Sequence, residues 1–416
     1  MTRPLDPSGL TGLLARPGVR RALDALAAPG AETRLVGGCV RDALLGVAAA
    51  DIDFATTLRP EQVMARAAEA GVKAVPTGIE HGTVTLVSAG EPVEVTTLRE
   101  DVETDGRHAV VRFGEDFGQD AQRRDFTINA LSLGPDGRLH DTVGGVADLE
   151  AGRVRFIGDA ATRIREDALR IMRFFRFHAR FGQYAPDADA LTACIAARDS
   201  LDGLSRERVR SEFLKLLLTE GCVPVTVILS QTGLLVRITG GVGDLGRLAR
   251  SAAAGHGAPL RLAALAVQSV TDADRLRERL RLSNAEAAML SSYAGTLAAL
   301  HGRSRIETAE MRALAAVHGP GMVAQTLAIV SGEPRPLVEA NAGDEIARLA
   351  SGETPTFPLV GADLVAAGIP PGRPIGKGLA AAKAEWLNRG CPLDGKSRSE
   401  LLTIAVDAAR ALSPTP

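Results

Sequence analysis

The residues best suited to chemistry lie in one early stretch, from Leu35 to Thr56. It reads LVGGCVRDALLGVAAADIDFAT and combines a glycine pair, an arginine and two carboxylates two residues apart. Asp51 and Asp53 alternate with apolar residues, as in a half-buried strand, so both side chains are expected on one face, roughly 6.5–7 Å apart at Cα. Mg²⁺ usually takes one or two protein carboxylates and completes its shell with water and phosphate oxygens. The stretch therefore predicts a Mg²⁺ site at Asp51 and Asp53.

The glycine pair, Gly37 and Gly38, precedes a predicted helix over residues 39–45 that Gly46 ends. Glycine lets the backbone turn tightly and approach a ligand closely, and a helix N-terminus favours anions. Gly37, Gly38 and Arg41 are therefore predicted to hold a triphosphate beside the metal. A structural turn beside an Asp-rich loop would explain either piece alone, but the ordered combination favours a nucleotide site.

This ordered pattern, GG-x-VRD-x-LLG followed by D-x-D, resembles motif A of the class II tRNA nucleotidyltransferases. That family comprises the CCA-adding enzymes and the bacterial poly(A) polymerases. The resemblance implies that Asp51 and Asp53 are catalytic metal ligands. Enzymes of this superfamily often use a third acid, and Glu94, between Val93 and Val95 on a predicted strand, is the candidate. An outward-facing polar residue is an equally good interpretation of Glu94.

A second cluster reads RRDFTINA and begins at Arg123. Its arginines can neutralise a polyphosphate, while Asp125 and Asn129 can bond ribose hydroxyls. A surface charge cluster would look the same in isolation. The cluster resembles motif B of the family, which implies that Arg124 contacts the nucleotide and that Asp125 selects the ribose. Residues 141–158 resemble motif C, a hinge, and no catalytic residue is predicted there.

Residues 162–181 contain neither Gly nor Pro and predict one uninterrupted helix. Helical spacing puts Glu166, Arg170 and Arg173 on one face. A charged face of this kind is usually only solvated. Within the segment, however, EDALRIMRFFRF resembles motif D, in which an Asp and an Arg read the incoming base. The nucleotide-binding candidates of this segment are Asp167, Arg170, Arg173 and Arg176.

Base reading by a protein is chemically reasonable for Asp167 and Arg170. A carboxylate accepts a hydrogen bond from an exocyclic amine, and a guanidinium donates to ring acceptors. Cytosine and adenine both present an amine beside a ring acceptor, whereas uracil and guanine present a carbonyl beside a ring N–H. A site that leaves buried polar groups unpaired can discriminate by up to ~10⁴–10⁵. The pair can therefore select C and A without a nucleic-acid template.

The fold class expected is an α+β nucleotidyltransferase head, a mixed sheet with helices, followed by an all-helical neck, body and tail. Local patterns predict a helical lead-in, a helix that Pro60 opens, three short strands before residue 98 and a mobile loop over residues 98–120. Ser205 caps a further helix to residue 218 that resembles motif E. The predicted domains are the head (1–138), the base-reading neck (139–220), the body (221–345) and the tRNA-binding tail (346–416).

Composition sets limits on the partners of the chain. Its 416 residues carry a net charge of −2, so an RNA-binding surface must be a local patch. One candidate is residues 361–379, where Arg373 and Lys377 accompany Gly- and Pro-rich turns; an ordinary loop is equally compatible. Four scattered cysteines without Cys-x-x-Cys spacing predict reduced thiols, a cytoplasmic location and no zinc site. Neither a secretory signal nor a membrane span is expected.

The reaction implied by the resemblance is template-independent addition of C, C and A to the 3′ end of tRNA. CTP and ATP would be the substrates, Mg²⁺ the cofactor, and pyrophosphate the leaving group. No obligate protein partner is evident. Two alternatives remain open at this point: another specificity, namely poly(A), CC-only or A-only addition, and a non-catalytic tRNA-binding protein.

Overall fold

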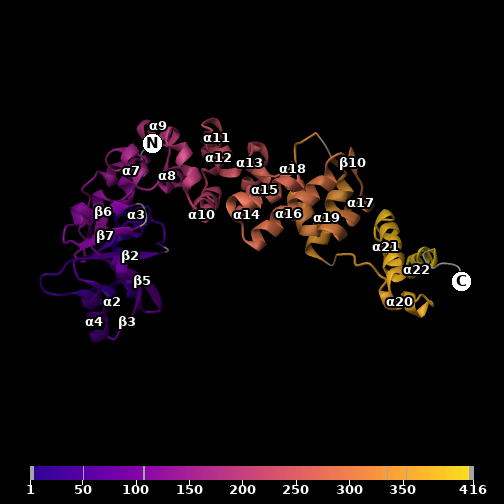
Figure 1. Ribbon diagram of the computed structural model, residues 1–416, viewed down its shortest axis with the longest axis horizontal. Coiled ribbons are helices and arrows are strands. Elements are labelled where there is room, and N and C mark those ends of the chain that lie inside the picture. The colour runs from indigo at the N-terminus through magenta and orange to yellow at the C-terminus, as the bar shows by residue number, and fades with distance from the viewer. Residues whose placement is uncertain (1–3, 50, 106–107, 335, 353, 412–416) are drawn as a thin grey trace. The chain divides into compact units, whose positions relative to one another are not determined.

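The computed structural model describes residues 4–49, 51–105, 108–334, 336–352 and 354–411 (Figure 1). Its contacts divide the chain into two compact units, one up to Ile238 and one from Thr239. The first unit contains the predicted head and neck, together with the first helices that were assigned to the body. The finer boundaries at residues 138, 220 and 345 stay predictions.

A seven-stranded mixed sheet forms the centre of the first unit, in the order β3-β4-β5-β2-β1-β8-β9. All neighbouring strands are antiparallel except β2 and β5, which are parallel. The mixed sheet confirms the expected α+β head. Its strands are β1 (Thr33–Val36), β2 (Ile52–Thr56), β3 (Lys73–Gly78), β4 (Thr83–Ser88), β5 (Glu91–Thr97), β8 (Ser132–Leu133) and β9 (Leu139–His140).

Short helices pack on this sheet and connect its strands. Helices α2 and α4 contact each other and the β3–β5 part of the sheet, and Val19, Val63, Val84 and Val95 are buried between them. Pro17 and Pro60 open these two helices, a position where the missing N–H costs nothing. The helices of this part are α1 (Pro7–Ala15), α2 (Pro17–Leu26), α3 (Gly38–Leu44), α4 (Pro60–Glu69), α5 (Phe117–Gln122) and the 3₁₀ turns η1 (Ile79–His81) and η2 (Thr127–Asn129).

The expectation of a loop over residues 98–120 is wrong. Strands β6 (Arg99–Asp105) and β7 (His108–Phe113) form a separate antiparallel ribbon, and α5 follows. A two-stranded ribbon outside the main sheet need not show the apolar–polar alternation of a half-buried strand. For this reason the charged sequence REDVETD did not indicate a strand.

Helices complete the first unit after β9. An aromatic cluster joins the RRDFTINA segment to α8: the Phe126 ring lies 4.8 Å from Phe156 and 5.4 Å from Phe177 between centroids. Such pairs stabilise by about 0.5–1.5 kcal/mol beyond the area they bury. The helices are α6 (Gly145–Glu150), α7 (Ala160–Glu166), α8 (Leu169–Phe181), α9 (Ala188–Ala196), η3 (Arg198–Gly203), α10 (Arg206–Leu217), α11 (Cys222–Gln231) and α12 (Leu234–Thr239).

The second unit is helical, as expected, apart from two-residue strands β10 (Arg305–Ile306) and β11 (Leu337–Val338). One hydrophobic cluster centres on Met311 and Val323, and another on Trp386 and Leu401. The helices are α13 (Leu245–Ala253), α14 (Ala258–Ala266), α15 (Val270–Leu280), α16 (Asn284–Leu300), α17 (Thr308–His318), α18 (Pro320–Val330), α19 (Ala340–Ser351), α20 (Gly361–Ala366), α21 (Arg373–Asn388) and α22 (Gly395–Arg410).

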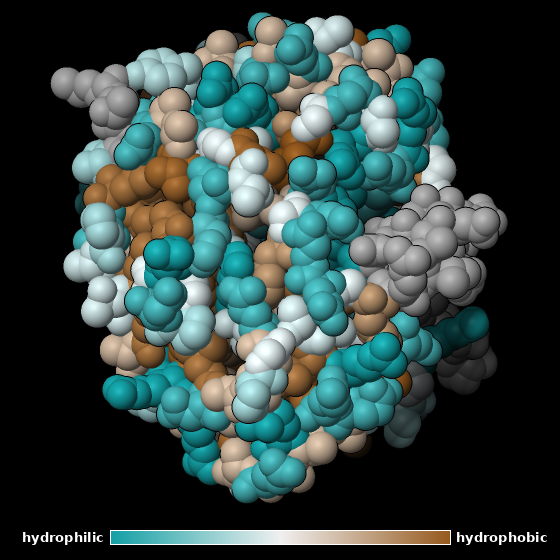
Figure 2. Space-filling view, turned by 90° about the vertical axis from the view of Figure 1, so that its left-hand side faces the viewer, coloured by the Kyte–Doolittle hydropathy of each residue, from teal (hydrophilic) through white to brown (hydrophobic). Residues whose placement is uncertain are grey.

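Polar residues cover most of the face shown in Figure 2, and apolar residues gather in smaller patches between them. Among the residues that the structure describes, no single helix has the length and apolar composition to cross a membrane. The bent pair α17 and α18 meets that test only jointly, with an angle of 116° between its helices.

Close packing of α21 on α22 gives a first prediction. A Cβ at Gly378 would lie 2.4 Å from the Ala405 carbonyl oxygen, so Gly378→Ala should destabilise this helix pair by about 1–3 kcal/mol. Gly376 lies on the same helix with open space around it, so Gly376→Ala should be neutral or stabilising by about 0.5–1 kcal/mol. Urea unfolding followed through the fluorescence of Trp386, the single tryptophan, measures both. Equal midpoints for the two variants would contradict the packing explanation.

Candidate active site

The register of β1 on β2 brings the glycine pair next to the two aspartates. Leu35 pairs with Phe54, so the residues that follow β1 lie beside the start of β2, where Asp51 and Asp53 are found. Gly37 has φ +75°, a backbone conformation that glycine adopts readily and other residues rarely. The first turn of α3 then lies on β2, because the Cys39 thiol donates to the Asp53 carbonyl oxygen at 3.8 Å.

Asp51, Asp53 and Glu94 lie near one another at this end of the sheet. Asp53 pairs with Glu94 in the parallel register of β2 and β5, so both side chains point to the same face. Burial raises the pKa of Asp53, the negative charges of Glu94 and Asp51 raise it further, and the Arg124 guanidinium opposes the rise. Glu94 and Asp51 are exposed, while Asp53 is half-buried. The predicted third acid therefore lies beside the predicted metal ligands.

The donor chemistry of this end fits a divalent cation. Clustered carboxylates that repel one another are stabilised by a bound positive charge. Within the described ranges, no three His, Cys, Asp or Glu side chains form a ready metal cage. An ion at Asp51 and Asp53 would therefore complete its shell with water and substrate phosphate oxygens, which is the usual arrangement for Mg²⁺.

Arg124 lies between the glycine turn and Asp53. Its Nε donates to Asp120 Oδ2 at 3.0 Å, and its Nη1 donates to the Asn129 carbonyl oxygen at 3.4 Å. A Cβ placed on Gly37 would come within 2.9 Å of that Nη1. The positive charge of the guanidinium also partly offsets the rise in the pKa of Asp53. Arg124, which was predicted to contact the nucleotide, therefore lies close to both Asp53 and the glycine pair.

Asp125 connects the sheet side of the site to α8. Its Oδ1 accepts hydrogen bonds from the Phe126 amide at 2.9 Å and from Asn129 Nδ2 at 3.0 Å. Its Oδ2 accepts from Arg173 Nε at 2.7 Å. These bonds fix the orientation of the predicted ribose-selecting carboxylate. Arg173, a predicted nucleotide contact, is a partner of Asp125 in this structure.

Arg41 is the predicted phosphate ligand whose position differs most from expectation. Its side chain is buried, with the residue 4% exposed, and its Nε donates to Asp42 Oδ1 at 2.8 Å. It also donates to the Asn129 side-chain oxygen, and its guanidinium stacks 4.3 Å from the Phe181 ring centroid. Arg41 therefore binds two protein side chains, Asp42 and Asn129, in this structure. A contact between Arg41 and a triphosphate stays a prediction.

The uninterrupted helix expected over residues 162–181 is wrong. Helix α7 ends at Glu166, Asp167 is extended with φ −152° and ψ 108°, and α8 begins at Leu169. The Asp167 carboxylate accepts the Leu169 amide at 3.0 Å, so it satisfies one of the free donors at the start of α8. Asp is well suited to such a cap, and neither Gly nor Pro marked the break in the sequence.

Two predicted nucleotide contacts on α8 are also paired with protein groups. Arg170 forms an ion pair with Glu166, and its Nη1 donates to the Arg163 carbonyl oxygen at 2.9 Å. Arg176 donates to Glu212 Oε2 at 2.5 Å and has a side chain only 14% exposed. The Arg170 side chain is similarly buried, at 17% exposed, but Glu212 at 7% is much more buried than Glu166 at 37%. The nucleotide contact of Arg176 stays a prediction, and in this structure its side chain joins α8 to α10 through Glu212.

Several positioning residues escaped the sequence analysis. Asp120 is 3% exposed and binds both arginines of the RRDFTINA segment; the i, i+3 and i, i+4 spacing of DAQRR was the available signal. Asp148 is fully buried and accepts from Thr127 Oγ1 at 2.6 Å, which ties the predicted hinge to the same segment. Glu212 lies far along the chain from Arg176, so no local spacing could have paired them.

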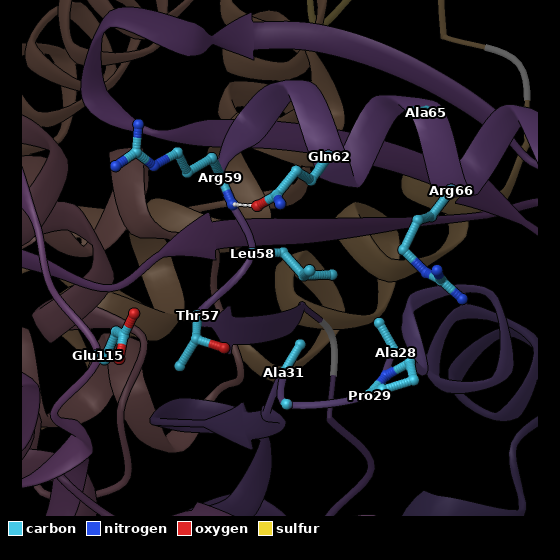
Figure 3. Close-up of a pocket in the computed structure, with 11 residues that line it drawn as sticks. Ala28, Pro29, Ala31, Thr57, Leu58, Arg59, Gln62, Ala65, Arg66 and Glu115 are labelled. Atoms are coloured by element: carbon cyan, nitrogen blue, oxygen red, sulfur yellow. Dashed lines mark hydrogen bonds between the residues drawn. The ribbon is translucent and has the colours of Figure 1, made fainter.

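A polar pocket in this unit lies away from these residues (Figure 3). It is formed by the turn before β1, the segment after β2 and Glu115, and Arg66 extends across it to donate to the Ala27 carbonyl oxygen. Thr57, which lines the pocket, follows the last residue of β2, whereas Asp51 precedes the first residue of that strand. The pocket therefore does not belong to the candidate site.

Comparison with known proteins agrees with this geometry. Residues 33–155 match the family described as Poly A polymerase head domain, and residues 184–239 match the probable RNA and SrmB-binding site of polymerase A. A mitochondrial CCA tRNA nucleotidyltransferase 1 of Mus musculus is 32% identical over 400 residues, which cover 93% of this chain and 89% of the relative. The chain belongs to the CCA tRNA nucleotidyltransferase family.

Two further members of the family support the assignment. The Danio rerio CCA tRNA nucleotidyltransferase 1, mitochondrial, is 39% identical over 264 residues, 61% of each chain. The crystal structure of the Bacillus stearothermophilus CCA-adding enzyme in complex with CTP superposes with a TM-score of 0.72 at 26% identity. That alignment covers 95% of this chain and 98% of the bacterial enzyme. The family fold therefore extends over both compact units.

The glycine turn gives a second prediction. Gly37→Ala should place a methyl group against Arg124 and force a non-glycine residue to a φ of +75°, so nucleotide addition should fall sharply. Gly30 has the same φ of +75° but open space around it, so Gly30→Ala isolates the backbone strain. Steady-state kcat/KM for both variants separates the two causes. Equal losses would mean that the contact with Arg124 is unimportant.

The raised pKa of Asp53 gives a third prediction. Because its pKa is higher in the folded protein than in the unfolded chain, ionised Asp53 reduces stability as pH rises through the folded value. Asp53→Asn should therefore raise the melting temperature at pH 7.5 in EDTA. The gain should shrink as pH falls toward about 4, the ordinary Asp value. Asp51→Asn, which removes only one of the charges that repel Asp53, should give a smaller gain. A stabilisation of Asp53→Asn that is the same at both pH values would contradict this explanation.

Proposed function

We propose that this chain adds C, C and A in sequence to the 3′ end of tRNA, using CTP and ATP and releasing pyrophosphate. Membership of the CCA tRNA nucleotidyltransferase family supports this activity. The single observation that carries the proposal is the convergence of Asp53, Glu94, Arg124 and Gly37 at one end of the sheet. Asp125 and Arg173 connect this convergence to the helix that begins at the proposed base-reading residues.

The chemistry proposed is an in-line attack of the RNA 3′-hydroxyl on the α-phosphorus of the nucleotide. The bond to the pyrophosphate oxygen breaks as the new phosphodiester bond forms. Arg124 neutralises charge on the phosphates, and the backbone at Gly37 and Gly38 allows them to approach closely. Asp125, held by Asn129 and Arg173, faces the ribose. Arg41 orients Asn129 by donating a hydrogen bond to its side-chain oxygen.

Asp51 and Asp53 are the proposed holders of Mg²⁺, with Glu94 beside them as a third catalytic carboxylate. When bound, the ion would supply positive charge for the attacking and leaving oxygens of the transfer. Burial and the negative charges of Glu94 and Asp51 raise the pKa of Asp53, and this unfavourable ionisation is the property of this chain that supports a cation there.

Selection of the base is assigned to Asp167 and Arg170. The carboxylate accepts from the exocyclic amine of cytosine or adenine, and the guanidinium donates to the adjacent ring acceptor. Both side chains lie at the start of α8 and are partly exposed, at 34% and 17%. They are thus held by the protein and accessible to solvent.

The tail is proposed to contact the phosphates of tRNA. Arg373 and Lys377 lie in the first two turns of α21, and both are exposed. Helix N-termini and cations bind phosphate oxygens without reading sequence. This arrangement suits an enzyme that must accept all tRNAs.

The compartment proposed is the cytoplasm. The four cysteines all lie in the described part of the chain, are buried and form no disulfide there, as expected for reduced thiols. Relatives of this chain include enzymes named as mitochondrial. The proposal therefore rests on the cysteines alone.

The test uses tRNA that lacks its CCA end, supplied with each nucleotide singly and in combination. Products sized on a sequencing gel should show two additions with CTP and one more when ATP is included. A long ladder with ATP alone would instead indicate poly(A) addition, and a stop after CC or after a single A would indicate a partial activity. No product under any condition would reject the catalytic proposal.

Base reading gives a fourth prediction. Asp167→Ala and Arg170→Ala should each remove one half of the pairing, a loss of about 1–3 kcal/mol by analogy with side-chain–base pairs. Use of CTP and ATP should fall, and rejection of UTP and GTP should relax relative to them. Arg165→Ala, an exposed arginine of α7 bonded to Thr162, is the control. Wild-type kcat/KM ratios for all four nucleotides in both test variants would contradict the role.

A further inference from the structure

The proposed base-reading carboxylate has a partner, Arg208, in the segment that resembles motif E, and no role for this arginine was predicted from the sequence. Asp167 Oδ1 accepts the Leu169 amide at 3.0 Å, and Oδ2 accepts Arg208 Nη2 at 2.7 Å. The two bonds come from different elements, because Leu169 begins α8 and Arg208 lies in the first turn of α10. Each carboxylate oxygen is therefore fixed by one of them, and each retains a second acceptor direction.

The position of Arg208 is set by the packing of α10 on α8. Helix α10 begins with Ser205 as its cap, which accepts the Arg208 amide at 3.4 Å. One turn further on, buried Glu212 binds Arg176 of α8 at 2.5 Å. Breaking a buried pair of this kind is costly, so the two helices are held together beside Asp167. Arg208 is thus carried on an element that is anchored to the base-reading helix.

We infer that Arg208 is a positioning residue for base selection, acting through Asp167; this inference rests on the proposed function. The terminal torsion of an aspartate is broad, so one hydrogen bond leaves the carboxylate free to rotate. Arg208 supplies the second bond and fixes the plane of the carboxylate. Each carboxylate oxygen then keeps one acceptor direction for the exocyclic amine of a base.

The ion pair between Arg208 and Asp167 is partly exposed to solvent, so it can rearrange when a base binds. The side chains of Arg208 and Asp167 are 50% and 34% exposed, so solvent weakens their attraction and the base can enter without a large cost. The effect expected from losing Arg208 is therefore modest. Discrimination of CTP over UTP should fall by about two- to fivefold, the range for partly exposed ion pairs.

The experiment measures kcat/KM for CTP, ATP, UTP and GTP on tRNA lacking its CCA end. Arg208→Ala should lower the CTP/UTP and ATP/GTP ratios, and Arg208→Lys should restore part of the loss because it keeps a charged donor. Arg208→Gln is the second variant if the alanine variant folds poorly. Arg206→Ala, two residues earlier and paired with Asp202 at 3.7 Å, is the matched control and should keep wild-type ratios.

A double-mutant cycle separates a role through Asp167 from a general structural role. In the Asp167→Ala background, Arg208→Ala should produce no further change in the ratios. An equal loss in both backgrounds, or unchanged ratios in the wild-type background, would overturn the inference. If the wild-type protein adds no C or A to tRNA, the proposed function fails instead. A wild-type protein that adds CCA alongside an Arg208→Ala variant with unchanged ratios rejects the positioning role only.

Discussion

The ion pair between Asp125 and Arg173 connects the two halves of the candidate site. Asp125 has a side chain 9% exposed, and its other oxygen binds Asn129, which in turn accepts from Arg41 of α3. Bonds therefore run without interruption from the helix after the glycine pair to the base-reading helix. A pair of this kind contributes little net stability, but loss of one partner is costly because the other stays uncompensated. Its main effect is to fix the distance between the carboxylates and the proposed base-reading residues.

At the three carboxylates of the proposed metal site, by contrast, the electrostatic interactions are unfavourable. Asp53, Glu94 and Asp51 repel one another, and burial of Asp53 adds to the cost of its charge. The Arg124 guanidinium opposes this repulsion at Asp53. The sheet register imposes the arrangement, since β2 and β5 are parallel and place Asp53 beside Glu94. The protein thus concentrates stabilising pairs around the site and accepts repulsion where a cation and phosphates are proposed to bind.

Sequence patterns predicted the elements that carry the site but not the contacts among them. The helix after Gly38 and the strand after Asp51 agree with the structure to within a residue or two, because apolar periodicity and glycine stops act locally. The break at Asp167 was missed because it is accompanied by a hydrogen bond that the Asp167 carboxylate accepts from the Leu169 amide, which the sequence pattern does not reveal. The pairings of Arg41, Arg176 and Arg208 depend on packing between distant segments, so residue spacing could not reveal them.

Protein-based choice between bases requires reading groups that are oriented before the base arrives yet still accessible to it. Asp167 and Arg170 satisfy both requirements, because each is paired with an opposite charge, Arg208 and Glu166, that is itself at least a third exposed. Fully buried partners would hold the reading groups too firmly to exchange bonds with a base, and isolated groups would pay the ordering entropy on every binding event. Partly exposed pairs lie between these limits. Accessible ion pairs that stabilise the fold only slightly therefore suit the proposed selection of C and A without a template strand.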